Sequence, residues 1–261
     1  MDSQARKREV SDIEQNRILL RGVPIEELIS GRSFAASLFL LLLGRLPDER
    51  EETVTRSVLI ALMDHGTDTP SCHATLSVLR GGTPLHVAVA AGILSFGERH
   101  GGTVEAAARL LQEGARRPGS PEAIAAEIVG LHAGLRERVP GFGHRLHDID
   151  PRTVALFKVA GEHNLKGRHC EVAEAIEHAL EDRFKRRLPL NVNGAAAALL
   201  SDMGFDWRLG SSFFILSRAA GLIAHAYGEI TRQLPEPDLG PVPWESGPGE
   251  PEGYDVIEGA E

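Results

Sequence analysis

Two short segments decide the fold of this chain: Pro140-Gly-Phe-Gly-His-Arg145 and, shortly after it, Asp150-Pro-Arg152. The first is rich in glycine, which lets the backbone take positive φ and approach a ligand closely. Its histidine, His144, can donate or accept a proton near neutral pH. In the second segment Asp150 can cap a helix, and proline suits the first helical position. We therefore predict a glycine-rich loop that presents His144 and leads directly into a helix.

Similar combinations of polar residues and glycine recur on both sides of this loop. They are Asp64-His65-Gly66, with His73 after it, then His100-Gly101-Gly102 and Asn191-Val-Asn193-Gly194. Polar residues at the ends of apolar helices are where function gathers, because loops on a rigid scaffold carry it. Each segment also has an ordinary structural explanation, since glycine commonly ends a helix. By themselves the residues predict a helical enzyme or binding domain with a histidine-rich cleft.

The remainder of the chain indicates helices. Alanine and leucine are abundant and aromatic residues make up only 5% of the chain, which favours helices over sandwiches or barrels. We expect roughly ten helices and no β-ladder, with only a small β-turn structure at 16–23. The helix at 84–97 is apolar almost all round and is expected to be fully buried. The expected helices are 33–43, 48–63, 70–79, 84–97, 103–116, 121–139, one from 150, 171–184, 195–203 and 209–231.

The charge of the chain is concentrated in its last residues. The formal net charge is −9, and residues 233–261 contain eight carboxylates and no Lys or Arg. The body is therefore nearly neutral, which argues against a nucleic-acid binder or a basic membrane surface. The tail is also rich in proline and glycine, so we expect it to be disordered or draped on a surface.

Cysteine content and hydropathy place the protein in an ordinary cytoplasmic class. Cys72 and Cys170 form no CxxC pattern, so neither a disulfide framework nor a zinc site is expected. The polar start gives no sign of a signal peptide. The most apolar run, 34–43, is about half the ~20 residues that cross a bilayer. We expect a cytoplasmic protein that meets no membrane.

The motifs, taken in order, resemble those of the citrate synthase superfamily. PGFGHR with DPR at 140–152 resembles a signature of citrate synthases and of the citryl-CoA lyase module of ATP-citrate lyase. PLNVNG at 189–194, DHG at 64–66, HGG at 100–102 and SRAAG at 217–221 match further segments of that superfamily. The matches extend over residues 15–232. The short N-terminal part and the spacing of His65 and His73 favour the lyase branch.

This resemblance implies an all-α, two-domain helical fold. Residues 1–101 and 206–232 would form the large domain, 102–205 an inserted small domain, and 233–261 the tail. A cleft between the domains would hold the substrate and close on it to exclude water. The resemblance also implies a homodimer or a higher homo-oligomer.

It further implies roles for the histidines and arginines. His144 would contact the oxygen of the carbinol that is formed or cleaved, and His100 would donate to the enol oxygen of acetyl-CoA. His65 and His73 would line the pocket for the acid. Two sets of cations complete the site: Arg152 and Arg218 for the substrate carboxylates, and Arg145, Lys185, Arg186 and Arg187 for the phosphates of CoA.

Asn193 departs from the resemblance, because the superfamily has an aspartate at this position of its motif. That aspartate moves the proton of the acetyl-CoA methyl group, and an amide has no useful basicity. General-base catalysis is worth roughly 10²–10⁴ in rate. Asp202 or a bound water could serve as base instead, or the enolate could form by another route.

Three functions stay open from the sequence. The first is cleavage of citryl-CoA, or of a related 3-hydroxy-acyl-CoA acid, to acetyl-CoA and a 2-oxo acid such as oxaloacetate. The second is a synthase that condenses an acyl-CoA with an oxo acid. The third is a non-catalytic relative that binds a CoA ester or a carboxylate. None of them needs a metal or a redox cofactor, since the thioester activates its own substrate.

Overall fold

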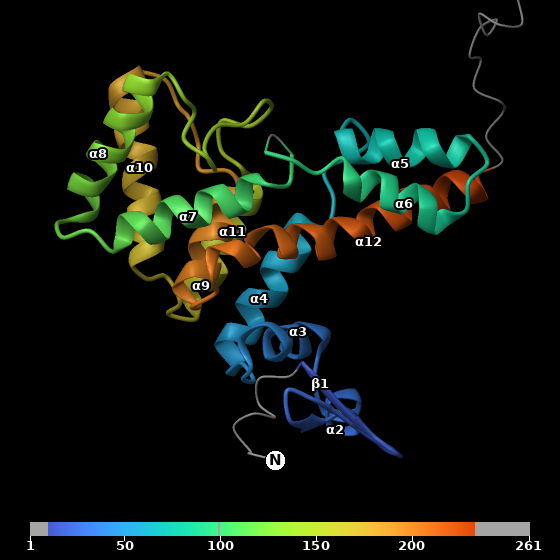
Figure 1. Ribbon diagram of the computed structural model, residues 1–261. Helices are drawn as coiled ribbons and strands as arrows, with labels where there is room; N and C mark the ends of the chain where they lie inside the picture. The colour runs from blue at the N-terminus through green and yellow to red at the C-terminus, as the bar shows by residue number, and fades with distance from the viewer. Residues whose placement is uncertain (1–9, 99, 233–261) are drawn as a thin grey trace, which may run out of the picture.

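The computed structural model describes residues 10–98 and 100–232, so the predicted acidic tail lies outside the described residues. The described chain is mostly helical, as predicted (Figure 1). The helices are α2 (Ile25–Gly31), α3 (Phe34–Leu43), α4 (Glu49–Leu62), α5 (Pro70–Arg80), α6 (Leu85–Leu94), α7 (Thr103–Ala115), α8 (Pro121–Leu135), α9 (Pro151–Glu162), α10 (Arg168–Phe184), α11 (Val192–Asp202), the 3₁₀ turn η1 (Trp207–Leu209) and α12 (Gly210–Thr231).

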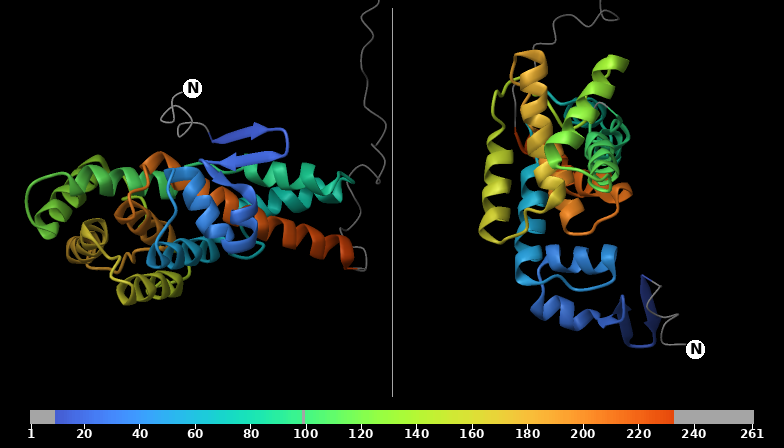
Figure 2. Two further views of the ribbon diagram at one scale, coloured as in Figure 1. Left: turned by 90° about the horizontal axis from the view of Figure 1, so that it is seen from below. Right: turned by 90° about the vertical axis from the view of Figure 1, so that its left-hand side faces the viewer.

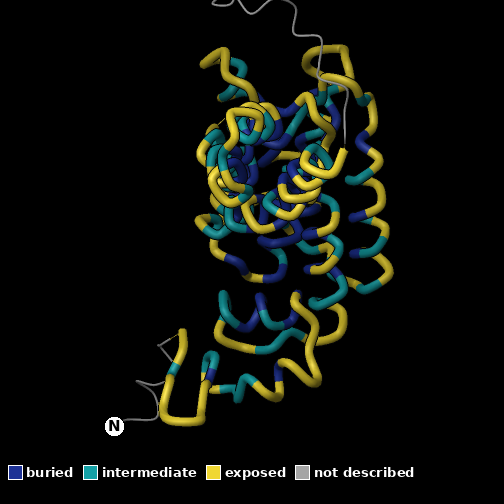
Figure 3. Tube along the Cα trace, turned by 90° about the vertical axis from the view of Figure 1, so that its right-hand side faces the viewer, coloured by how far each residue is buried: buried dark blue, intermediate teal, exposed yellow. Residues whose placement is uncertain are grey.

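The N-terminal region contains a small antiparallel sheet, so the expectation of no β-ladder was wrong here. Strand β1 (Ser11–Glu14) pairs with β2 (Arg17–Leu20), which pairs with the two-residue β3 (Val23–Pro24). Arg21 and Gly22 join β2 to β3 with φ of 51° and 83°. Positive φ at both central residues is what a type I′ hairpin turn requires. Figure 3 shows that this sheet is largely exposed, whereas buried residues concentrate in the helices.

Helix α11 is the centre of the core. All of its residues except Asn193 and Asp202 are buried. The run of alanines from Ala195 to Ala198 carries only methyl groups, so neighbouring helices can approach it closely. Helices α7, α10, α9 and α4 pack around it (Figures 1 and 2). Its first turn is therefore held rigidly from several sides.

Helix α12 connects this bundle to a second group of helices. It contacts α4 and α7 in the bundle, and it also packs against α5 and α6, which form an antiparallel pair at the right of Figure 1. The stretch Trp207–Thr231 is long and apolar enough to cross a membrane, but 44% of its most apolar window is buried against the protein. These packing contacts account for its buried apolar residues, whereas others, such as Ile223 and Tyr227, are exposed.

Helix α6 corrects one sequence expectation, because it is not buried on all sides. Ala88, Val89 and Gly92 are buried against α5 and α12. Leu94 on the other side is 85% exposed. A helix that is apolar on all sides is expected to be buried, but the pattern does not show whether its own chain buries every side.

One hydrophobic core extends through both predicted domains. It includes Leu38 and Phe39 from the N-terminal segment, Ala195 from the predicted small domain and Phe213 from α12. The division at 101/102 and 205/206 stays a prediction.

Candidate active site

The glycine-rich loop lies against the segment that precedes α11. The amide of Gly143 donates to the carbonyl of Pro189 at 2.7 Å, and the amide of Asn191 donates to the carbonyl of Gly141 at 3.0 Å. The side-chain nitrogen of Asn191 also donates to the carbonyl of Gly143 at 3.0 Å. The PGFGHR and PLNVNG motifs are therefore joined along their backbones.

Two glycines allow this close contact. A Cβ atom on Gly194 would lie 2.5 Å from the carbonyl oxygen of Gly141, far inside van der Waals contact. Gly141 itself has φ of 87°, which L-residues with a side chain rarely adopt. The glycine at each position is a steric requirement of the loop contact.

Asp150 attaches the DPR segment to the same place. One of its carboxylate oxygens accepts from the backbone N–H and the Nε of Arg152, and the other accepts from Arg152 Nη2 at 2.8 Å and from the amide of Val192 at 3.0 Å. Burial raises the pKa of Asp150, but the hydrogen bonds and the charge of Arg152 outweigh it and hold that pKa below its usual range. The carboxylate is thus ionised, and it fixes the guanidinium of Arg152 beside the loop.

The position of its backbone neighbours fixes the tautomer of His144. Its Nδ1 accepts from the amides of Leu146 and His147 at 3.1 and 3.2 Å. A neutral imidazole with Nδ1 as acceptor carries its proton on Nε2. Burial and then the charge of His147 lower the pKa of His144, which favours the neutral form. His144 is consequently a fixed hydrogen-bond donor at Nε2.

Three histidines form one cluster. The ring of His65 lies edge-on to His144 with centroids 5.2 Å apart, and His147 stacks on His144 at 4.4 Å. Burial lowers the pKa of His65, and the charges of Arg152, His144 and Arg218 lower it further. His147 was missed in the sequence, where its only signal is a position three residues after His144 in the same loop.

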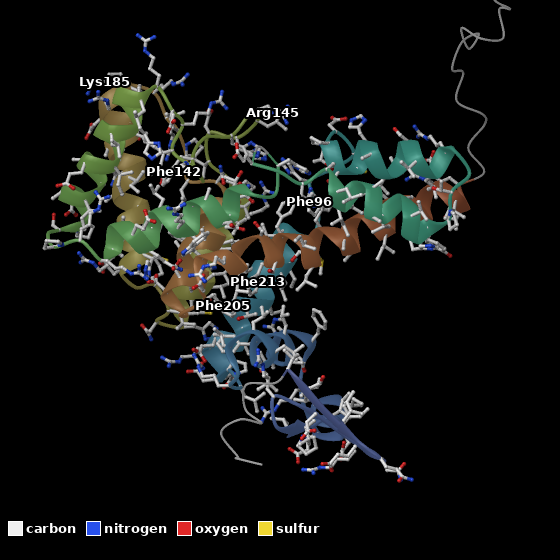
Figure 4. All side chains as sticks on the ribbon, viewed as in Figure 1. Phe96, Phe142, Arg145, Lys185, Phe205 and Phe213 are labelled. Atoms are coloured by element: carbon white, nitrogen blue, oxygen red, sulfur yellow. The ribbon has the colours of Figure 1, made fainter. Side chains whose placement is uncertain are left out.

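His100 lies between aromatic rings. Phe96 and Phe214 each contact it edge-on at 5.6 Å, and Phe96 is labelled in Figure 4. Its Nε2 is 2.8 Å from the hydroxyl of the buried residue Ser71 on α5. Burial, then the charges of Arg218 and His65, lower the pKa of His100 to about 4, so the ring is neutral. When Ser71 donates to Nε2, the proton of His100 is on Nδ1 and available to a ligand.

Ser71 was also missed in the sequence. A serine in the first turn of a helix has an ordinary structural explanation, and its contact with a loop 29 residues away has no local signal.

Arg218 is a buried cation without a carboxylate partner among the described residues. It is 3% exposed and lies over the ring of Phe214 at 4.8 Å. Its Nε donates to the carbonyl of Leu62 at 3.3 Å, whereas its buried Nη1 has no hydrogen-bond partner. Burial lowers the pKa of Arg218, and the charge of Asp64 opposes that effect. A buried guanidinium with an unused N–H is a site for an anion.

Gly221 and Asp64 place α12 against the DHG loop. A Cβ on Gly221 would lie 2.2 Å from the carbonyl oxygen of Met63, so only glycine permits this approach. Asp64 accepts from the amide of Gly66 at 3.0 Å and pairs with Nε2 of His225 on α12 at 3.0 Å. These contacts hold α12, which carries Arg218, against the loop that carries His65.

Asn193 lies in the first turn of α11, which begins three residues earlier than expected because Asn191 caps it. The side-chain oxygen of Asn191 accepts from the amides of Asn193 and Gly194. The side-chain oxygen of Asn193 is buried without a hydrogen-bond partner. Its carboxamide nitrogen makes no hydrogen bond with the described part of the chain.

Not every candidate residue joins this site. His73 is exposed on α5 and shares no ring contact with the three clustered histidines. Arg145, Lys185, Arg186 and Arg187 are exposed. Figure 4 shows Arg145 and Lys185 along the same upper edge of the molecule. Their predicted contacts with CoA phosphates are not tested by the structure.

Asp202 is excluded as the substitute base. It accepts from the amides of Gly167, His169 and Cys170 at the start of α10 and pairs with Nδ1 of His169 at 2.8 Å. Burial raises the pKa of Asp202, but these hydrogen bonds hold it below its usual range. It lies at the end of α11 opposite to Asn193 and caps a helix. No group of three or more His, Cys, Asp or Glu among the described residues could hold a metal ion.

The fold and these motifs agree with the comparisons to known proteins. Residues 47–234 match the family model "Citrate synthase, C-terminal domain", and the chain belongs to the citrate synthase family. Within it, the structure resembles that of citryl-CoA lyase from Hydrogenobacter thermophilus, with a TM-score of 0.82 and 38% identity over 97% of this chain and 95% of that one.

ATP-citrate lyases are also similar. An aspartate-to-alanine mutant of the enzyme from Methanosaeta concilii, in complex with (3S)-citryl-CoA, has a TM-score of 0.76 and 24% identity over 88% of this chain and 40% of that one, which supports the fold. ATP-citrate synthase beta chain protein 2 of Arabidopsis thaliana is 28% identical over 90% of this chain and 40% of its own length. The chain thus spans about two fifths of such relatives.

Proposed function

We propose that this protein is a citryl-CoA lyase-like enzyme. In this reaction the hydroxyl of citryl-CoA gives its proton to water as the adjacent C–C bond breaks. The electron pair of that bond passes to the thioester, giving oxaloacetate and the enolate of acetyl-CoA, which then takes a proton at carbon. A related 3-hydroxy-acyl-CoA acid would react in the same way. The similarity to a citryl-CoA lyase over nearly the whole chain supports this proposal.

The observation that carries the proposal is the unpaired guanidinium of Arg218. A buried charge is costly unless it is paired, and Nη1 has no partner among the described residues. The substrate carboxylate is the partner that we propose. Arg152, which is held by Asp150, would take a second carboxylate, as a polycarboxylic acid requires.

The two neutral histidines would then serve the two oxygens at which charge develops. The Nε2–H of His144 would donate to the carbinol oxygen, and His100 would donate to the enolate oxygen of the thioester. Preorganised donors of this kind stabilise a transition state without reorganising. No metal or redox cofactor takes part in this scheme, and the CoA phosphates would meet the cations at Arg145 and 185–187.

The reverse condensation must begin by removing a methyl proton from acetyl-CoA, and cleavage must return a proton to the same carbon, so the lack of a base at position 193 slows that proton transfer in both directions. Asn193 cannot accept that proton, and the carboxylate of Asp202 already accepts hydrogen bonds from backbone amides at the start of α10. We also propose that the protein works in the cytoplasm as a homo-oligomer. Exposed apolar residues on α6 and α12, including Leu94 and Tyr227, would be covered by a second copy.

Purified protein given citryl-CoA should release oxaloacetate, measured with malate dehydrogenase and NADH. Arg218→Met should raise KM roughly 10- to 100-fold, because it removes a charge-assisted hydrogen bond. It should not lower the melting temperature, since it also removes an uncompensated buried charge. Arg208→Met, at an exposed arginine, is the control. Absence of oxaloacetate, or an unchanged KM in Arg218→Met, would contradict the proposal.

A further inference from the structure

Two carboxylates, those of Asp150 and Asp64, lie against the histidines and arginines of the site, and both already accept hydrogen bonds. Both oxygens of Asp150 are occupied by Arg152 and the amide of Val192. The oxygens of Asp64 accept from Gly66 and pair with His225. Burial raises the pKa of each, yet their hydrogen bonds hold both pKa values below the usual range. Neither carboxylate is poised to take a proton from carbon.

The histidines and arginines of the site supply hydrogen-bond donors and positive charge. His144 presents Nε2–H, Arg218 presents an unused N–H, and Asn193 carries a neutral amide. Burial lowers the pKa of His100 most, and the charges of Arg218 and His65 lower it further. Such a site stabilises negative charge well and abstracts protons poorly.

A donor-rich site of this kind generates an enolate most easily by breaking a C–C bond. Removal of a proton from the α-carbon needs a base beside that carbon. Heterolysis of a C–C bond does not, because the electron pair of the broken bond stays on the α-carbon. Cleavage of citryl-CoA is one such reaction. Loss of CO₂ from a thioester that carries a carboxylate on its α-carbon is another, and it produces the same enolate.

We propose that this site also decarboxylates malonyl-type CoA thioesters. This inference rests on the proposed function, because it uses the same site and the same enolate. The bond between the α-carbon and the carboxylate breaks, CO₂ leaves, and the electron pair forms the acetyl-CoA enolate. That carbon then takes a proton from water, which gives acetyl-CoA and hydroxide. When a 2-oxo acid is bound, the enolate carbon attacks its carbonyl instead and forms a 3-hydroxy thioester.

Two further features suit this substrate. An aspartate at position 193 would repel a carboxylate bound in the site, whereas the amide of Asn193 carries no charge. His100 would bind the enolate oxygen, and the rings of Phe96 and Phe214 beside it make the surroundings apolar.

The test follows the fate of labelled malonyl-CoA in D₂O. We expect the protein to release the labelled carboxyl carbon as CO₂ and to leave one deuterium in the methyl group of acetyl-CoA. His100→Ala should slow this reaction roughly 10²–10³-fold, the usual effect of losing an oxyanion donor. Asn193→Asp should slow decarboxylation and raise methyl-proton exchange of acetyl-CoA by roughly 10²–10⁴. Asn164→Asp makes the same change on an exposed loop and should alter neither rate.

Citryl-CoA cleavage, assayed on the same sample, separates the two proposals. Cleavage of citryl-CoA with malonyl-CoA decaying only at the buffer rate would overturn this inference and leave the lyase proposal standing. Decarboxylation without cleavage would overturn the lyase proposal alone. An Asn193→Asp variant that decarboxylates as fast as the original protein would show that the amide has no part in substrate choice.

Discussion

Two regions of this molecule differ in how completely their side chains and backbone groups find partners within the chain. The motif frame, residues 140–152 with 188–194, is closed by backbone hydrogen bonds, by the carboxylate of Asp150 and by the contact of Gly141 with Gly194. The helical arm, α5 and α6 with the C-terminal half of α12, leaves large apolar side chains in solvent. Leu94 is 85% exposed and Tyr227 is 62% exposed.

The difference indicates what each region has to do. The motif frame holds His144, Arg152 and Asn193 in fixed positions through backbone hydrogen bonds and the carboxylate of Asp150, although the side-chain oxygen of Asn193 itself has no partner. The helical arm also has polar pairs, such as Arg80 with Glu229 at 2.6 Å, but it leaves large apolar side chains exposed. Because buried networks are destabilised strongly when one partner is lost, changes in the frame should have larger effects than changes in the arm.

The largest effect on stability is expected from Asp150→Asn. The substitution keeps the shape of the side chain but removes the charge that pairs with Arg152, and it weakens the acceptor for the Val192 amide. Breaking a buried pair typically costs about 3–5 kcal/mol, and the value here should be near the lower limit because Arg152 is partly exposed. Urea unfolding measures the loss. Asp148→Asn, at an exposed residue of the same loop, should stay within about 0.5 kcal/mol.

A smaller loss is expected from Gly194→Ala. The added methyl group meets the carbonyl of Gly141, so the loop must move away, at a cost of about 1–3 kcal/mol. Gly130→Ala in α8 has open space around its Cβ and should stabilise by about 0.5–1 kcal/mol. Opposite signs for the two glycines would support a rigid motif frame. Equal effects would show that the loop yields without cost.

The frame could be predicted because its signals are local. Glycines with special φ, a capping aspartate before proline and histidine beside glycine are all visible in short segments. The sequence could not show which hydrogen-bond partners the polar side chains have. Asp202 was a plausible base until its partners 32 to 35 residues away showed it to be a helix cap.

The arm and the N-terminus were predicted less well for a different reason. Strands of four residues are too short to show a period of two, so the β1–β2–β3 sheet was not expected. The apolar pattern of α6 was seen, but full burial was inferred from it. Leu94 shows that such a pattern cannot distinguish a core residue from an exposed one.

His100 contacts the helical arm, because Nε2 of its ring lies 2.8 Å from the hydroxyl of Ser71 on α5. Its pKa in the folded protein is about 4, below the ordinary value of 6.5, so the unfolded chain binds the extra proton first. Stability should therefore fall as pH decreases from 6.5 towards 4. His100→Gln should lose less stability over this range in urea unfolding, and His86→Gln, at an exposed histidine of α6, should behave like the original protein. Identical slopes for all three would show that His100 is not held neutral.

The smallest effect on the stability of a single chain is expected from Leu94→Glu. The side chain is exposed, so its replacement should change the unfolding free energy by no more than about 0.5 kcal/mol at concentrations where the chain is monomeric. Assembly should respond differently, since a buried carboxylate at an interface has no partner there. Sedimentation velocity should show that the original protein associates and that Leu94→Glu does not.

A control for Leu94→Glu is Ile29→Glu on α2, which is equally apolar and 77% exposed but lies outside the helical arm. If both variants associate like the original protein, the arm is not the contact between copies. If Ile29→Glu alone prevents association, the contact lies at the N-terminal sheet and α2 instead. Loss of association in Leu94→Glu alone would show that a second copy of the chain covers the exposed apolar residues of the helical arm. The motif frame, by contrast, is held by contacts within one chain.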